Sequence, residues 1–168
     1  MKPKLILLAI ILTTISCTNE RQTTLSQTRK DSITKEVESV LNQIIDDWRT
    51  KNINTVYNQF LNSPDFTFIA VDGSIVDYST MIESSRSMLD SWKDVRYNLV
   101  EKKINIVNQT FVIASIIYNC EITYPDGKIE KYPKVGSTLG FGKINNKWSV
   151  LHFQESCLAP DVIQPEKK

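Results

Sequence analysis

The segment GKINNKWSVLHFQES, residues 142–156, has the pattern of two strands joined by a tight turn. Asn145 and Asn146 are residue types that tolerate the backbone conformation of such a turn, and strand-forming residues flank them on both sides. Strand alternation after the turn gives two faces, one with Ser149, Leu151, Phe153 and Glu155, the other with Trp148, Val150, His152 and Gln154. The pattern alone does not say which face points inward.

The first of these two strands is predicted to begin at residue 128, and two more strands precede it, in residues 95–107 and 110–124. Residues 108–109 and 125–127 separate them and are of the types that form tight turns. Short turns between successive strands favour an antiparallel meander of four strands.

Helical periodicity dominates the part of the chain before residue 94. A first amphipathic helix is expected from about residue 33, capped near Asp31 or Ser32, and a shorter one after Asn54. A third is expected over residues 79–92, and Asp72-Gly73 predicts a hairpin before it. Helices followed by a long meander indicate an α+β fold with the sheet curled over about three helices.

The strand at 110–124 is apolar on both faces, whereas an antiparallel sheet that faces water on one side should alternate. A second copy of the protein is the simplest cover for the outer face, which predicts a homodimer. The residues expected on that dimer face are Val112, Ala114, Ile116, Val150 and His152.

The first 16 residues read as a signal peptide, because Lys2 and Lys4 precede an apolar run that is too short to span a bilayer of about 30 Å. Cys17 follows small residues and resembles the lipidated cysteine of a bacterial lipobox, although an ordinary secretory signal is the alternative. The lipoprotein reading places the protein in the bacterial cell envelope, on the outer membrane and facing the periplasm. Residues 17–32 would then be a flexible tether, 33–160 the domain, and 161–168 a disordered tail.

The charges nearly cancel, with 20 Lys+Arg against 19 Asp+Glu, so a nucleic-acid-binding role is disfavoured. We expect contact with the membrane only through the lipid. No Cys/His spacing indicates a metal site, and no cofactor is expected. Cys120 and Cys157 are either two small core residues or a bonded pair.

Residues from about Thr34 to Pro160 resemble the nuclear transport factor 2-like, or ketosteroid-isomerase-like, superfamily and within it the SnoaL-like polyketide cyclases. The order of the helices, the FIAVDG hairpin, the helix ending at Trp92 and the closing GKINNKWSVLHFQES carry the resemblance. It implies a cone-shaped half-barrel with a pocket between the helices and the concave sheet, often in a dimer.

The resemblance also implies that Glu155, which precedes the closing serine, lines the pocket, and that His152 points to the convex side. The expected pocket residues are Trp48, Tyr57, Phe60, Phe68, Ser115, Ile117, Ser137, Leu139, Phe153 and Glu155. A carboxyl among apolar residues should have a raised pKa, which would suit a general acid or base, or a ligand-binding group. The alternative is a glutamate at a fraying strand end that reaches water.

Steroid isomerisation is not expected. The resemblance places the catalytic tyrosine and carboxylate of ketosteroid isomerase near Ile44 and Ala70, and neither has the required chemistry. The arginines of anion-binding family members are missing as well. Three functions remain: binding of a small apolar or weakly basic molecule, a lyase, cyclase or isomerase-type enzyme using Glu155 with Tyr57 or Ser137, and an interaction module of the envelope.

Overall fold

The computed structural model describes residues 25–165. The predicted signal peptide, the lipidation of Cys17 and the start of the predicted tether lie outside the described residues. No helix of residues 25–165 is long and apolar enough to cross a membrane.

The first helix, α1 (Gln27–Arg49), begins six residues before the predicted start. The Ser26 side chain caps it by accepting a hydrogen bond from the backbone N–H of Arg29 at 3.3 Å. The predicted tether therefore ends before residue 26 instead of at 32. Apolar periodicity missed the first two turns because their side chains are largely exposed and polar, whereas Ile33, Val37 and Leu41 are fully buried.

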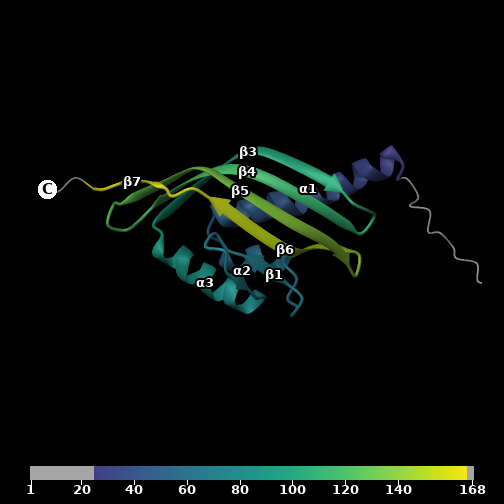
Figure 1. Ribbon diagram of the computed structural model, residues 1–168, viewed down its shortest axis with the longest axis horizontal. Helices are drawn as coiled ribbons and strands as arrows, with labels where there is room; N and C mark the ends of the chain where they lie inside the picture. The colour runs from purple at the N-terminus through teal and green to yellow at the C-terminus, as the bar shows by residue number, and fades with distance from the viewer. Residues whose placement is uncertain (1–24, 166–168) are drawn as a thin grey trace, which may run out of the picture.

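Two shorter helices follow. α2 (Ile53–Val56) starts one residue before the predicted cap Asn54 and continues as a 3-10 turn, η1 (Tyr57–Gln59). α3 (Tyr78–Ser91) is capped by Asp77, whose carboxylate accepts from the Thr80 N–H at 2.8 Å. Figure 1 shows α1 running behind the long strands, with α2 and α3 below them.

A curved, unclosed mixed sheet covers the helices, as the α+β prediction requires (Figure 1). Its path is β2-β1-β6-β5-β4-β3, and β7 pairs with β5. All pairs are antiparallel except that of β1 with β6. The strands are β1 (Thr67–Ile69), β2 (Ile75–Val76), β3 (Asp94–Ile106), β4 (Phe111–Thr123), β5 (Ile129–Ile144), β6 (Lys147–Cys157) and β7 (Asp161–Ile163).

A β-bulge in β6 changes which residues face the core. Phe141 pairs with Val150 but Gly140 pairs with His152, so Leu151 is the extra residue. Val150 therefore shares the concave face with Phe153 and Glu155, and simple alternation along this strand is wrong. Val150 is fully buried, while Leu151 and His152 are half-buried.

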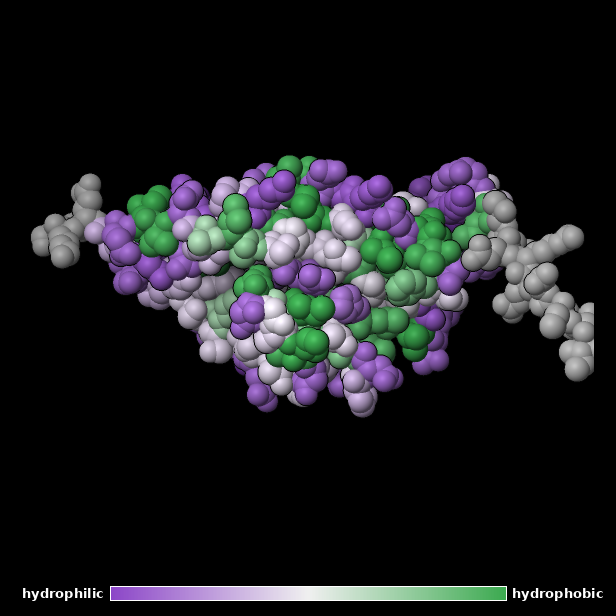
Figure 2. Space-filling view, viewed as in Figure 1, coloured by the Kyte–Doolittle hydropathy of each residue, from purple (hydrophilic) through white to green (hydrophobic). Residues whose placement is uncertain are grey.

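The predicted dimer face is wrong for four of its five residues. Val112, Ala114, Ile116 and Val150 are buried in the main core, at most 7% exposed, because the even-numbered side chains of β4 point toward the helices. The outer face of β4 instead carries Phe111, Ile113, Ser115 and Ile117, all half-buried. His152 is the one predicted member that lies on the outer side. Figure 2 shows apolar side chains reaching the surface in patches among hydrophilic residues.

The chain end is also more ordered than predicted. β7 continues beyond β6 and pairs with the start of β5, with Lys131 opposite Asp161 and Ile129 opposite Ile163. The disordered tail predicted from residue 161 is thus wrong for residues 161–163. Short strands at a sheet edge give little apolar periodicity, so the sequence offered no signal for this pairing.

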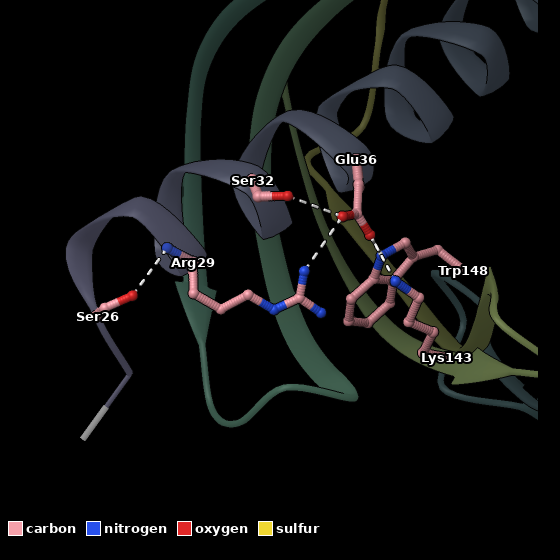
Figure 3. Close-up of polar contacts among 6 residues, drawn as sticks. All are labelled: Ser26, Arg29, Ser32, Glu36, Lys143 and Trp148. Atoms are coloured by element: carbon pink, nitrogen blue, oxygen red, sulfur yellow. Dashed lines mark hydrogen bonds and ion pairs between the residues drawn. The ribbon is translucent and has the colours of Figure 1, made fainter. Parts of the chain in front are cut away.

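Glu36 joins the N-terminal half of α1 to the β5–β6 hairpin (Figure 3). Its Oε2 accepts hydrogen bonds from Lys143 Nζ at 2.7 Å and from Trp148 Nε1 at 2.8 Å. Ser32 Oγ donates to Oε1 at 3.0 Å, and an Arg29 nitrogen lies 3.6 Å from the same oxygen. The Lys143 and Trp148 donors lower the pKa of Glu36 to about 2.

We expect Glu36→Gln to destabilise the fold by about 1–2 kcal/mol at neutral pH, a value reduced for the partial exposure of the carboxylate. Because the pKa is about 2 in the folded state against 4.5 ordinarily, the stabilisation is complete above pH 4.5 and is lost as pH falls toward 2. Urea unfolding at pH 7 and pH 2.5 measures this. An equal difference between wild type and variant at the two pH values would contradict the proposed role.

Candidate functional site

A cavity of about 270 Å³ lies between the helices and the concave face of the sheet. Leu41, Ile44 and Trp48 of α1 form part of one wall, and residues of β3 to β6 form the other. Val71 and Met88 also line it and are 60% and 40% exposed, so they mark its opening. Mostly apolar walls with a few polar groups are typical of small-molecule sites.

Glu155 is the only charged residue among the described residues that line the cavity. It lies on β6 opposite Ser137 of β5, which in turn lies opposite Ile116 of β4. Tyr118 Oη donates a short hydrogen bond to Glu155 Oε1, and Ser137 Oγ donates to the same oxygen at 3.1 Å. No described residue donates to Oε2, so this oxygen is free to bind a ligand or a proton.

Burial raises the pKa of Glu155 above its ordinary value, and the hydrogen bonds from Tyr118 and Ser137 oppose that shift only partly. The neighbouring hydroxyl is affected in turn: burial and then the Glu155 charge raise the pKa of Tyr118. A carboxyl with a raised pKa and a free oxygen can take up or release a proton, or hold a cation.

A second polar cluster lies toward the other end of β5. Glu130 Oε2 accepts from Tyr124 Oη at 2.9 Å and from Tyr132 Oη at 3.1 Å. Lys128 Nζ is 3.0 Å from Glu130 Oε1 and lies 3.9 Å from the centre of the Tyr124 ring. Tyr124 and Tyr132 line the cavity, whereas Glu130, which accepts from both hydroxyls, is not among the lining residues.

The predicted pocket residues fall into three groups. Six of them line the cavity: Trp48, Phe60, Ser137, Leu139, Phe153 and Glu155. Tyr57 and Phe68 do not line it but pack behind it, with Tyr57 5.7 Å from the Phe60 ring and Phe68 stacked on Phe153 at 5.0 Å. Ser115 and Ile117 were placed wrongly, since they alternate with the lining residues Ile116 and Tyr118 and so lie on the outer face.

Tyr118, which donates to Glu155, is one of the lining residues that sequence reasoning missed, and Tyr97, Tyr124 and Tyr132 are others. The register counted back from the turns set Glu155 level with Gly136, whereas its neighbour is Ser137. The prediction also assigned the odd-numbered side chains of β4 to the pocket. Alternation placed Tyr118 with Ile116, so a correct choice of face would have found it.

The two cysteines of the described domain are free. Cys120 and Cys157 both line the cavity, on β4 and β6 with β5 between them. Within residues 25–165, no group of three or more His, Cys, Asp or Glu side chains is arranged to hold a metal ion.

Residues 37–160 match the SnoaL-like domain family. A nuclear transport factor 2-like superfamily protein from Salmonella enterica is 16% identical with a TM-score of 0.69, over 77% of this chain and 94% of that one. No curated protein matches the sequence.

Two further solved structures are similar in fold. A candidate scytalone dehydratase from Novosphingobium aromaticivorans has a TM-score of 0.69 at 7% identity, over 85% of this chain and 94% of that one. A type 2 hexachlorocyclohexane dehydrochlorinase has a TM-score of 0.68 at 6% identity, over 82% and 93%. Identities this low establish a shared fold and leave function to the residues of the site.

Proposed function

The chain belongs to the SnoaL-like domain family, and on that premise we propose that it binds a small apolar or weakly basic molecule in the cavity beneath the sheet. One observation carries the proposal: a single carboxylate, Glu155, with a free oxygen, in a wall that is otherwise uncharged and rich in aromatic rings. An apolar wall of this kind binds the apolar surface of a ligand, and the carboxylate orients one polar group of that ligand. The absence of Lys, Arg and His among the described lining residues argues against an anionic ligand.

Binding of a neutral apolar probe tests the pocket itself. We expect N-phenyl-1-naphthylamine to bind at one saturable site, to change the emission of Trp48 and Trp92, and to raise Tm. The variant Leu139→Trp places a large ring in the cavity wall and should abolish the binding. If the probe does not saturate, or if it binds Leu139→Trp as tightly as wild type, the pocket is not a ligand site.

An elimination enzyme is a second candidate function. The observation in its favour is that Glu155 Oε2 has no protein donor, so it could take a proton from a substrate carbon next to a leaving group. Two fold neighbours, a dehydratase and a dehydrochlorinase by name, are named for reactions of this class. Turnover that Glu155→Gln abolishes would favour the enzyme, and a modest loss of affinity alone would favour the binding protein.

We propose that the protein is located in the bacterial envelope, where a lipid on Cys17 holds the domain at the outer membrane. The sequence of residues 1–17 supports this location. The two N-terminal lysines, the apolar run and the cysteine are the basis of this proposal. Mass spectrometry of the N-terminal peptide from cells tests it: an N-terminal Cys17 with lipid on its thiol and on its amine is expected, and an unmodified or absent Cys17 in the mature protein would contradict it.

We also propose that two copies pair through the outer face of the sheet. Phe111, Ile113, Ile117 and Leu151 are half-buried apolar residues on that face, which corrects the residue set predicted from the sequence. Covering such a face is a common reason for dimerisation. Sedimentation equilibrium should give the mass of two chains, falling to one in Ile113→Lys. A single-chain mass for wild type at micromolar concentration would contradict pairing, and would also weaken the third function, an envelope interaction module.

A further inference from the structure

Four hydroxyl groups in the cavity wall have their protons committed to carboxylates. Tyr118 and Ser137 donate to Glu155, and Tyr124 and Tyr132 donate to the carboxylate of Glu130. A hydroxyl that donates its only proton to a carboxylate offers a ligand its lone pairs alone. These two clusters therefore present hydrogen-bond acceptors to the cavity, and a ligand that matches them must bring donors.

The two clusters lie apart along the sheet. Ser137 and Tyr132 are five residues apart on β5, which corresponds to at most about 17 Å of strand. Val135 lines the cavity between these two positions on β5, and Cys120 lines it directly opposite Tyr132. A ligand that reaches both clusters is therefore elongated, with an apolar middle.

The clusters differ in charge. Lys128 neutralises Glu130 through an ion pair at 3.0 Å. The group of the ligand that binds at the Tyr124 and Tyr132 hydroxyls should therefore be an uncharged hydrogen-bond donor. No described lining residue is a cation that could neutralise Glu155. The aromatic rings of Trp48 and Phe153 line the same cavity as Glu155, and ring faces attract cations. A positive group on the ligand thus belongs at the Glu155 end.

We propose that the ligand is an elongated monocationic amine, with its ammonium group at Glu155 Oε2 and a neutral O–H or N–H donor at the hydroxyls of Tyr124 and Tyr132. This inference rests on the proposed binding function and narrows its ligand class. Simple carboxylic acids and ligands whose polar groups only accept hydrogen bonds are excluded from the class.

At a pH where Glu155 is partly protonated in the free protein, amine binding should also release a proton, because an ammonium at Oε2 favours the ionised form of Glu155. The other ionisable groups around Glu155 do not compete near neutral pH, since burial raises the pKa of each above its ordinary value of 9 or 10. They are Tyr57, Tyr97, Tyr118, Cys120 and Cys157.

Calorimetry with three probes on one skeleton tests the inference: 4-(4-aminobutyl)phenol, the neutral 4-(4-hydroxybutyl)phenol and the anionic 4-(4-hydroxyphenyl)butanoate. We expect the amine to bind at least about tenfold more tightly than the alcohol, and the acid to bind most weakly. Glu155→Gln should bring the amine to the level of the alcohol. Tyr132→Phe should weaken amine and alcohol by the same factor, since it removes an acceptor that both probes use.

Two outcomes separate the inference from the function on which it rests. If N-phenyl-1-naphthylamine binds and the amine gains nothing over the alcohol, the ligand class is wrong and the pocket stands. If no probe binds, both are overturned. A measurement on wild type alone gives an independent check: titrations in two buffers of different ionisation enthalpy should report proton release with the amine and none with the alcohol. Equal uncorrected heats in the two buffers, at a pH where Glu155 is partly protonated in the free protein, would mean that no proton is released and would overturn the inference even if a variant failed to fold.

Discussion

Glu155→Gln is expected to stabilise the folded protein at neutral pH. Glutamine keeps the shape of the side chain, and its carbonyl oxygen can accept the bonds that Tyr118 and Ser137 donate to Oε1. Since the folded-state pKa of Glu155 is raised, the wild type loses stability as pH rises through that pKa, and the neutral glutamine does not. We expect a gain of about 1–3 kcal/mol at pH 8 that disappears below pH 4.5, where Glu155 is protonated in both states.

Thermal unfolding of wild type and variant across pH 4–8 measures this gain. Glu101→Gln is the matched control, because Glu101 is exposed on β3 and should change stability by no more than about 0.5 kcal/mol at any pH. If Glu155→Gln destabilises the protein at pH 8 and not at pH 4, the ionised form of Glu155 stabilises the fold. The claim that burial disfavours the Glu155 carboxylate would then be wrong.

Phe141→Ala should produce the largest loss of stability that we predict. Phe141 is fully buried, and its neighbours across the sheet are Val112 and Val150. Removing a buried phenyl ring typically costs about 3–5 kcal/mol, because the lost contacts add to the cost of the cavity left behind. For a chain of this size we expect Tm to fall by roughly 10 °C.

Leu151→Ala is the control for the β6 bulge. Simple alternation from Phe153 would bury Leu151 and expose Val150, whereas the bulge turns Leu151 outward over Gly142. The control should therefore cost only about 1 kcal/mol, much less than Phe141→Ala. Losses of equal size, measured by urea unfolding, would place Leu151 in the core and contradict the register of β6.

The fold was largely predictable because its signals are local. The helical spacing from Ile33 onward, the hairpin at Asp72-Gly73 and the turn at Asn145-Asn146 each specify one element, and all three are confirmed. Asn145 and Asn146 adopt positive φ angles of 48° and 63°, as a tight hairpin turn requires. The parallel pairing of β1 with β6 was not predicted, since it joins residues about 85 positions apart with no local signal.

The site was harder to predict because each bulge reverses the face of every residue beyond it. Two bulges, an extra residue on β5 between Tyr132 and Val135 and the extra Leu151 on β6, have no recognisable signal in the sequence. Ser115 and Ile117 were chosen in place of Ile116 and Tyr118 for another reason: β4 is apolar on both faces, so the sequence does not show which face points inward. Glu155 was placed on the pocket face because the family resemblance implies that the residue before the closing serine lines the pocket.

The central claim is that the Glu155 carboxyl faces an apolar cavity that holds a ligand. Carbon NMR of the protein labelled at glutamate side-chain carboxyl carbons tests it most directly, with the Glu155 signal assigned by its loss in Glu155→Gln. We predict titration above the ordinary pKa of 4.5 in the free protein, and a shift to lower pH when 4-(4-aminobutyl)phenol is added. A signal that titrates at or below 4.5 and does not move with any of the probes would contradict the claim.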